Sequence, residues 1–227
     1  MTLVCMNNQL RVCVLISGSG SNLQALIDQR DAGSLPIEIA LVISNNPEAA
    51  GLQRAAKAGI TCQVIDHKLF EARSDFDLAL AAAINQVKPD LLILAGFMRI
   101  LGSGALSGIH CDAINLHPSL LPLYQGTHTY QRALDAGDSE HGASIHFVTA
   151  ELDGGPVISQ VRIPILPGDD SESLAARLGP QEHRLITATV ELFCRRQVSF
   201  TQAGVIIDAN LIHNPLQLNS DGSLGQK

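Results

Sequence analysis

Apolar and polar positions alternate along this chain in two periods, one typical of strands and one typical of helices. Short, almost continuous apolar runs predict strands that are covered on both faces. The expected strands are residues 11–16, 37–44, 63–65, 91–96 and 113–115. The helical patterns between them run through residues 23–27, 48–58 and 74–87. Repeated alternation of strand and helix favours an α/β fold, with a doubly wound, mostly parallel sheet and helices on both faces.

The second half of the chain predicts two further strands that extend this sheet in the opposite direction. Residues 143–149 and 156–164 are rich in β-forming residues. The segment between them is too short for a crossover helix, so the two strands should run antiparallel, with Asp153 at their tip. A helix is expected before them, at residues 130–136.

The C-terminal part is expected to be less regular. An acidic start at residues 169–172 favours a last helix, because carboxylates stabilise a helix N-terminus. Gly179 and Pro180 should break that helix before it resumes through Phe193. Residues 203–212 are β-prone, and the Gly- and Ser-containing tail at 217–227 is expected to be frayed.

Composition narrows the class of protein. With 227 residues, of which 46% are apolar and 16% charged, we expect a single domain over residues 1–227. No apolar run reaches the length of a bilayer span and no signal-peptide pattern is present, so a soluble cytoplasmic protein without a membrane partner is expected. A net charge of −7 disfavours nonspecific nucleic-acid binding. The five scattered cysteines are expected to be reduced, and no cluster has metal-ligand spacing, so no metal is expected.

A polar pair, Asn115 and His117, stands at the end of an apolar run and is followed at once by Pro118. Side chains two apart in a strand share a face, and proline cannot continue a central strand, so His117 is expected at a strand end. Open α/β sheets bind their ligands at that edge. An amide that can hold an oxyanion, beside an imidazole that can move a proton, is typical of acyl transfer. A structural histidine next to ordinary turn chemistry is the alternative.

The segment SGSGSN at residues 17–22 joins the first expected strand to the first helix. A turn of this kind aims free N–H groups and the positive end of a helix dipole at an anion, so Gly20, Ser21 and Asn22 are expected to cradle a phosphate. Leu23 stands where a dinucleotide-binding motif has its third glycine, and the lysine of a P-loop is missing. Tight-turn geometry alone is the alternative.

Two other features have more than one interpretation. The apolar loop at residues 97–101 follows a buried strand, where a planar ligand could lie, and ordinary core lining is equally compatible with it. His146 alternates with Ile145 and Phe147 and so faces away from them. A packed structural role for His146 is slightly favoured over a role in a cleft.

Four segments carry a family resemblance: ISGSGSNLQ at residues 16–24, LAGFMRIL at 94–101, NLHPSLLP at 115–122 and DGGP at 153–156. Together they resemble the 10-formyltetrahydrofolate-dependent formyltransferases, in particular the branch that acts on glycinamide ribonucleotide. The Asn-x-His-Pro-Ser pattern is shared by the whole family, whereas the Ser-Gly-x-Gly-Ser-Asn turn is narrower. The resemblance covers about residues 10–200. It implies a Rossmann-like fold and transfer of the formyl group of 10-formyltetrahydrofolate to the amine of 5-phosphoribosylglycinamide in de novo purine biosynthesis.

The resemblance also implies a role for each matching residue. Asn115, His117 and Asp153 match the catalytic residues. The ribonucleotide site is matched by Gly20, Ser21, Asn22 and Glu182. The folate site is matched by Arg73, Met98, Arg99, Ile100, Leu101, Asn115, Thr149, Ala150, Glu151, Leu152 and Asp153. Residues 10–110 would then form the phosphate-binding half, and residues 111–200 the catalytic and folate-binding half.

The chemistry implied is direct attack of the amine on the formyl carbon through a tetrahedral intermediate, without a metal or an acyl-enzyme. Asn115 would hold the oxyanion, and His117 would protonate the leaving nitrogen. Asp153 would keep the pKa of His117 high enough for that proton transfer. A monomer or a homodimer is expected.

Three positions depart from the family pattern. Gly179 stands where relatives often have Gln, which puts one ribose or phosphate contact in doubt, and Leu123 and Gln125 should change loop packing more than chemistry. A deformylase is expected to carry an extra N-terminal domain, and a methionyl-tRNA formyltransferase a basic C-terminal domain. A dinucleotide-binding oxidoreductase is disfavoured because residues 44–46 offer no acidic partner for a ribose. A catalytically inactive sensor of the same fold would show no turnover.

Overall fold

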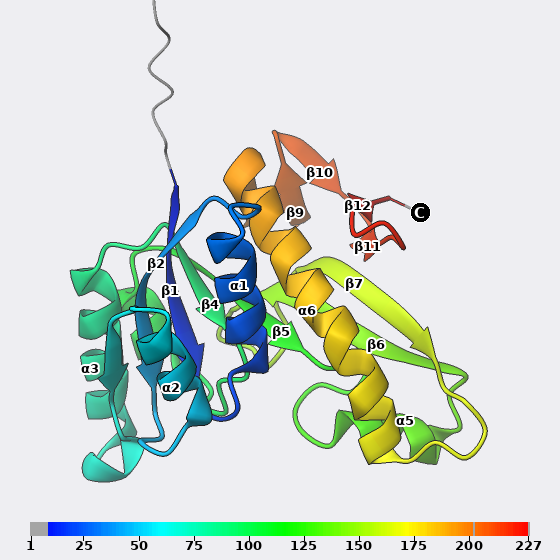
Figure 1. Ribbon diagram of the computed structural model, residues 1–227, viewed down its shortest axis with the longest axis horizontal. Coiled ribbons are helices and arrows are strands. Elements are labelled where there is room, and N and C mark those ends of the chain that lie inside the picture. The colour runs from blue at the N-terminus through cyan, green and yellow to red at the C-terminus, as the bar shows by residue number, and fades with distance from the viewer. Residues whose placement is uncertain (1–8, 202, 227) are drawn as a thin grey trace, which may run out of the picture.

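The computed structural model describes residues 9–201 and 203–226, and its strands form one central sheet and one small sheet (Figure 1). The central strands are β1 (Leu10–Ile16), β2 (Ile37–Ser44), β3 (Cys62–Val64), β4 (Leu91–Leu94), β5 (Asp112–His117), β6 (Glu140–Phe147), β7 (Val157–Pro164), β11 (Leu216–Leu218) and β12 (Leu224–Gly225). The small sheet holds β8 (Val198–Thr201), β9 (Gly204–Ile207) and β10 (Asn210–Ile212). The helices are α1 (Ser21–Asp31), α2 (Ala50–Lys57), the 3₁₀ helix η1 (His67–Leu69), α3 (Arg73–Gln86), α4 (Ser103–Gly108), α5 (Thr129–Ala136) and α6 (Ser171–Arg195).

The central strands follow the order β12-β11-β7-β6-β5-β4-β1-β2-β3. The five strands from β3 to β5 in this order run parallel, whereas β6 pairs antiparallel with both β5 and β7. The predicted doubly wound, mostly parallel sheet with an antiparallel extension is confirmed. After β1 the chain forms β2 and β3 on one side of β1 and then returns to form β4 on the other side. Open α/β sheets bind their ligands at the carboxyl ends of the strands at such a switch point.

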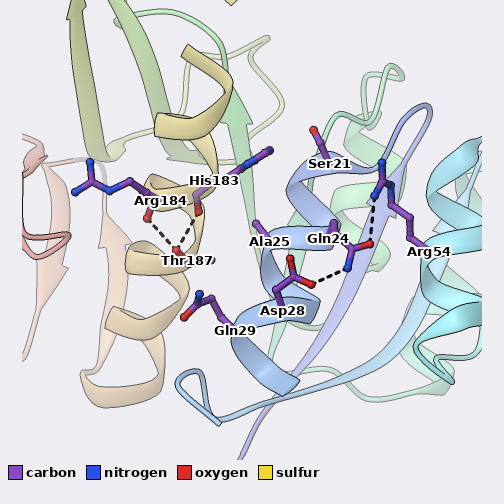
Figure 2. Close-up of a pocket in the computed structure, with 9 residues that line it drawn as sticks. All are labelled: Ser21, Gln24, Ala25, Asp28, Gln29, Arg54, His183, Arg184 and Thr187. Carbon is purple, nitrogen blue, oxygen red and sulfur yellow. Dashed lines mark hydrogen bonds between the residues drawn. The ribbon is translucent and has the colours of Figure 1, made fainter. Parts of the chain in front are cut away.

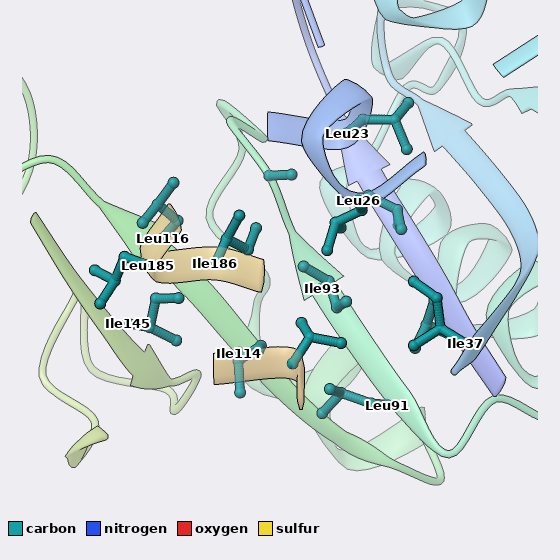
Figure 3. Packing of buried hydrophobic residues seen from close by; sticks show 14 of the residues in the cluster. Leu23, Leu26, Ile37, Leu91, Ile93, Ile114, Leu116, Ile145, Leu185 and Ile186 are labelled. Carbon is teal, nitrogen blue, oxygen red and sulfur yellow. The ribbon is translucent and has the colours of Figure 1, made fainter. Parts of the chain in front are cut away.

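Alternate side chains of β1 are buried on opposite faces of the sheet, because successive residues of a strand point to opposite sides. Val14 belongs to an apolar cluster that includes Leu26 of α1 and Ile186 of α6, two of the residues in Figure 3. Leu15 belongs to a second cluster, which includes Leu80 of α3. Burying a side chain of this size contributes roughly 1.5–3 kcal/mol. Helices therefore cover both faces of the parallel part of the sheet, as the uninterrupted apolar runs predict.

The prediction that Gly179 and Pro180 break the last helix is wrong, because α6 continues through both residues. Leu178 and Leu185, which lie before and after Gly179 and Pro180, are both fully buried. Their packing keeps the two halves of α6 collinear. Pro180 is exposed and so is Ala176, whose carbonyl loses its helical partner. Water can satisfy that carbonyl, which keeps the cost of the proline small.

The prediction of a frayed tail also differs from the structure. Residues 216–218 form β11, which pairs parallel with β7, and β12 then pairs with β11. Leu216 is buried, and Arg184 of α6 donates Nη2 hydrogen bonds to the carbonyls of Asn219 and Ser220. The otherwise open edge of β7 supplies free backbone partners, and these hold a segment whose composition alone favours disorder.

Candidate active site

β5 ends at His117, directly before Pro118, as the missing N–H of proline requires. Asn115 and His117 both lie at the carboxyl end of this strand, two residues apart. In the antiparallel register with β6, Asn115 lies opposite His146, and Asn115 Nδ2 is 3.1 Å from His146 Nε2. The pairing of these two strands therefore brings a second imidazole to the site.

Asp153 lies between the two histidines, at the tip of the connection from β6 to β7. Its Oδ2 is 3.5 Å from His117 Nδ1, and its Oδ1 is 3.6 Å from His146 Nε2. The backbone N–H of Gly126 donates to Asp153 Oδ2 over 2.8 Å. Asp153 has a φ of 48°, a left-handed conformation that is costly for a residue with a side chain. The carboxylate is thus held in one place by groups from three separate segments.

Backbone carbonyls fix which nitrogen of each imidazole is free. His117 Nε2 lies 2.9 Å from the Tyr124 carbonyl oxygen, which can only accept, so Nε2 carries a proton and Nδ1 faces the carboxylate. His146 Nδ1 lies 2.9 Å from the carbonyl oxygen of Phe147 and donates to it for the same reason. In its neutral form, His146 Nε2 then accepts a hydrogen bond from the Asn115 amide. The second N–H of that amide stays available to a ligand.

Burial and charge displace the pKa values of this group. Burial lowers the pKa of His117 below its usual range, and the hydrogen bond to Tyr124 and the Asp153 charge act against it. Burial acts to raise the pKa of Asp153, but the neighbouring His146 imidazole, the hydrogen bond from the Gly126 N–H and the neighbouring His117 imidazole outweigh it and leave that pKa below its usual range. At neutral pH Asp153 is therefore ionised, and His117 is mainly neutral and able to accept a proton.

The glycine-rich turn lies at the carboxyl end of β1, and Gly20 directly precedes α1. Gly20 has a φ of 70°, and a Cβ built there would lie 2.5 Å from Gly51 Cα, so no larger residue fits without movement of α2. The first bond of the helix runs from Gln24 N to the Gly20 carbonyl. The N–H groups of Ser21 and Asn22 precede that bond and have no partner within the helix, as an anion site requires.

The first turn of α1 meets α5 and α6 through polar side chains. Asn22 Nδ2 donates to Glu182 Oε2 over 3.5 Å, and the Tyr130 hydroxyl donates to Glu182 Oε1 over 3.4 Å. Burial raises the pKa of Glu182, and these two hydrogen bonds act against it. Asn22 is 9% exposed, and its buried Oδ1 has no hydrogen-bond partner among the described residues. The predicted Asn22 and Glu182 thus lie together, and Tyr130 joins them.

The apolar loop after β4 lies beside the glycine-rich turn. Ser17 Oγ accepts a hydrogen bond from Met98 N over 2.7 Å and donates to Asn45 Oδ1 over 2.6 Å. Arg73 Nη2 donates to the Ile100 carbonyl over 2.6 Å. The side chains of Met98 and Ile100 are 77% and 51% exposed, whereas Leu101 is buried in the core. The loop therefore offers exposed apolar side chains next to the Arg73 guanidinium, and the buried Leu101 packs the loop against the core.

The connection that carries Asp153 also holds the other residues predicted for the folate site. Thr149 is half-buried, and residues 150–152 are exposed. Gln125, one of the departures from the family pattern, donates through Nε2 to the Asp153 carbonyl over 3.3 Å, and Leu123 is exposed. Gln125 thus adds a contact to the backbone of the loop that carries Asp153.

Two residues near this group were not assigned to it from the sequence: His146, for which a packed role was slightly favoured, and Tyr130, which was not singled out. His146 carried a usable signal, because its polar side chain alternates with apolar neighbours in a strand, but the signal does not say which partner strand it faces. Nothing in the sequence marks Tyr130, because a tyrosine in the first turn of a helix is ordinary. Within residues 9–201 and 203–226, no cluster of three or more metal-binding side chains occurs, and no helix is both long and apolar enough to cross a membrane.

Comparisons with known proteins place this geometry in context. The sequence profile of the formyl transferase family matches residues 10–190. Phosphoribosylglycinamide formyltransferase of Escherichia coli K12 is 41% identical over 199 residues, which cover 88% of this chain and 94% of that protein. The trifunctional purine biosynthetic protein adenosine-3 of Drosophila melanogaster is 48% identical over 175 residues, 76% of this chain but 13% of that protein. The crystal structure of glycinamide ribonucleotide transformylase 1 from Symbiobacterium toebii matches with a TM-score of 0.86 and 38% identity, covering 91% of this chain and 98% of that one.

Proposed function

Since this chain belongs to the formyl transferase family, we propose that it transfers the formyl group of 10-formyltetrahydrofolate to the amine of 5-phosphoribosylglycinamide in purine biosynthesis. The family predicted from the four sequence motifs is confirmed by these matches. The enzyme is a folate-dependent formyltransferase. The observation that carries the proposal is the carboxylate of Asp153 between two buried imidazoles, within 3.6 Å of each, with the Asn115 amide beside them.

The two substrates are proposed to meet at the carboxyl end of β5. The ribonucleotide phosphate lies on the N–H groups of the turn, and its ribose contacts the carboxylate held by Tyr130. The ribonucleotide site consists of Gly20, Ser21, Asn22 and Glu182. The folate site consists of Arg73, Met98, Arg99, Ile100, Leu101, Asn115, Thr149, Ala150, Glu151, Leu152 and Asp153. Alignment of two bound reactants can remove roughly 7–11 kcal/mol from the barrier of a bimolecular reaction.

Asn115 stabilises the charge that develops when the amine nitrogen bonds to the formyl carbon. One N–H of its amide is directed at His146, and the other donates to the new oxyanion. A donor in this role contributes roughly 10²–10³-fold to kcat. Because the bond to His146 holds the amide plane, the donor needs little reorganisation as the charge appears.

His117 moves the proton that the reaction must relocate. Its neutral Nδ1 takes the proton released by the attacking amine, and the carboxylate of Asp153 stabilises the imidazolium. The same nitrogen gives the proton to N10 of the folate as the carbon–nitrogen bond breaks and the carbonyl reforms. The products are the formylated ribonucleotide and tetrahydrofolate. The lowered pKa of His117 suits this proton transfer, because the imidazole is neutral before the attack and can return the proton afterwards near neutral pH.

The test is to mix the purified protein with 10-formyltetrahydrofolate and follow release of the folate product by absorbance, with and without the ribonucleotide amine. Release is expected only when the amine is present. Equal release in its absence would identify a hydrolase of the deformylase type. No release in either case would indicate a binding protein that keeps the fold without the activity.

We further propose that the reaction takes place in the cytoplasm, without a nucleic-acid or membrane partner. Cys13, Cys62, Cys111 and Cys194 are all unpaired, which suits a reducing compartment. The expectation of a monomer or a homodimer stays a prediction, which sedimentation equilibrium would test.

A further inference from the structure

A cavity of about 420 Å³ lies between α1 and α6, next to the turn proposed to hold the substrate phosphate (Figure 2). Its lining includes Ser21, the first residue of α1, together with Arg54 of α2 and His183 of α6. None of the catalytic residues Asn115, His117 or Asp153 lines it. The cavity therefore belongs to the ribonucleotide end of the molecule and not to the place where the formyl group moves.

Arg54 is held against the turn by two hydrogen bonds. Its Nε donates to the Ser19 carbonyl over 2.8 Å, and its Nη1 donates to Gln24 Oε1 over 3.3 Å. Figure 2 shows the guanidinium reaching from α2 to the side of α1 that carries Ser21. A guanidinium has five N–H donors, and only these two have partners among the described residues. The remaining donors are available to a ligand that occupies the cavity.

Two guanidinium groups line the cavity, those of Arg54 and Arg184, and they differ in their hydrogen bonding. His183 has a pKa below its usual range, because of burial and the nearby Arg54, with Asp28 acting against both. Asp28 accepts a hydrogen bond from Gln24 Nε2 over 2.8 Å. Arg184 also lines the cavity, but its guanidinium donates to Gln181 and to two carbonyls of the C-terminal segment. In a chain with a net charge of −7, a guanidinium with free donors beside the turn makes the local potential more positive.

Gly179 lies on the same helix as His183 and has no side chain. It lies three residues before Glu182 and four before His183, so all three positions share one face of α6. A Cβ at Gly179 would meet nothing within 4 Å, so no neighbouring atom fills this position. α6 therefore supplies no hydrogen-bonding side chain at Gly179.

We propose that Arg54 is a phosphate-binding residue, whose guanidinium donates to the substrate phosphate held by the N–H groups of Ser21 and Asn22. A phosphate dianion fits the forked donors of arginine. Arg54 then selects for the 5′-phosphorylated form of the substrate. This inference rests on the proposed function, because it assumes that the ribonucleotide is the amine donor.

The first test compares Arg54→Gln with the wild-type protein on two amines, glycinamide ribonucleotide and the same compound without its phosphate. Glutamine can still donate to the Ser19 carbonyl, so the turn keeps its support while the charge is lost. We expect kcat/KM to fall roughly ten- to hundredfold for the ribonucleotide and to stay unchanged for the unphosphorylated amine. Arg54→Lys should recover part of the loss, because it restores the charge without the fork. Lys57→Gln, at an exposed cation of the same helix, is the matched control and should change neither value.

A second test does not depend on turnover. Inorganic phosphate is titrated into the free protein while the amide resonances of Ser21 and Asn22 are followed by NMR. Phosphate should shift these resonances in the wild-type protein, with roughly tenfold weaker binding in Arg54→Gln. Equal phosphate affinity in both proteins, or equal losses of kcat/KM for both amines, would overturn the inference and leave Arg54 as a support for the turn. Failure of the proposed function alone would abolish turnover and leave the phosphate titration intact.

Discussion

The two regions proposed to bind the substrates, the ribonucleotide end and the formyl-transfer end, are built in different ways. The ribonucleotide end is made mainly from the backbone of consecutive residues, 20–22, at the start of one helix. The formyl-transfer end is made from side chains of β5, β6 and the connection between β6 and β7, which meet only after the sheet has formed. A site of backbone N–H groups tolerates side-chain changes, whereas a site of converging side chains depends on each of them. Substitutions at the transfer end should therefore reduce the rate, and those at the ribonucleotide end should reduce affinity.

The largest effect is expected for His117→Ala. The Nδ1 atom that accepts and returns the proton is lost, and kcat should fall roughly 10²–10⁴-fold while folate binding is retained. Stopped-flow turnover together with equilibrium folate binding would measure both quantities. His110→Ala, at an exposed histidine, is the matched control. A variant that turns over at the wild-type rate would show that another group moves the proton.

Asp153→Asn should have the next largest effect and should also change the pH dependence. The Asp153 charge raises the pKa of His117, so its removal lets burial lower that pKa further. The midpoint assigned to His117 in the pH–rate profile should move to lower pH, and kcat at neutral pH should fall roughly ten- to hundredfold. An asparagine oxygen can still accept from the Gly126 N–H, so the loop keeps its position. An unshifted midpoint would contradict the pairing.

His146→Gln tests the residue that the sequence did not assign to the site. A glutamine cannot combine the bond to the Phe147 carbonyl with the bond from the Asn115 amide in the same geometry, so the oxyanion donor becomes less well held. We expect kcat to fall roughly five- to tenfold, with KM for both substrates unchanged. Steady-state kinetics with each substrate varied would separate these values. A rise in KM with kcat preserved would indicate a packing role only.

The same contrast explains what could be predicted from sequence. The end of β5 follows from Pro118, and the tight turn before α1 follows from Gly20 and the residues directly after it, because these are local rules of backbone geometry. Asn115 and His117 share a strand end for the same reason. The position of His146 beside Asn115 depends instead on the register between β5 and β6, which no local pattern specifies. Its alternation with apolar residues slightly favours a core histidine and is also compatible with a site residue.

Long-range packing also explains the two elements that were predicted wrongly. Gly179 and Pro180 oppose a helix locally, but Leu178 and Leu185 are buried on either side of them and fix its direction. The segment at residues 217–227 has a composition typical of a loop, yet the open edge of β7 gives part of it a strand to pair with. In both cases the energy of tertiary contacts exceeds the local preference.

Asn22→Ala should have the smallest effect, because it removes a side chain from the end that is built from backbone. The N–H groups of Ser21 and of residue 22 itself remain, so the phosphate keeps its principal donors, and KM for the ribonucleotide should rise only about fivefold. The loss comes from the bond to Glu182, whose carboxylate would be less well positioned for the ribose. The KM for 10-formyltetrahydrofolate and kcat should stay unchanged, which steady-state kinetics at saturating second substrate would establish. Equal losses for both substrates would mean that the turn and the formyl-transfer group respond as one unit, and the division of labour between the two ends would then be wrong.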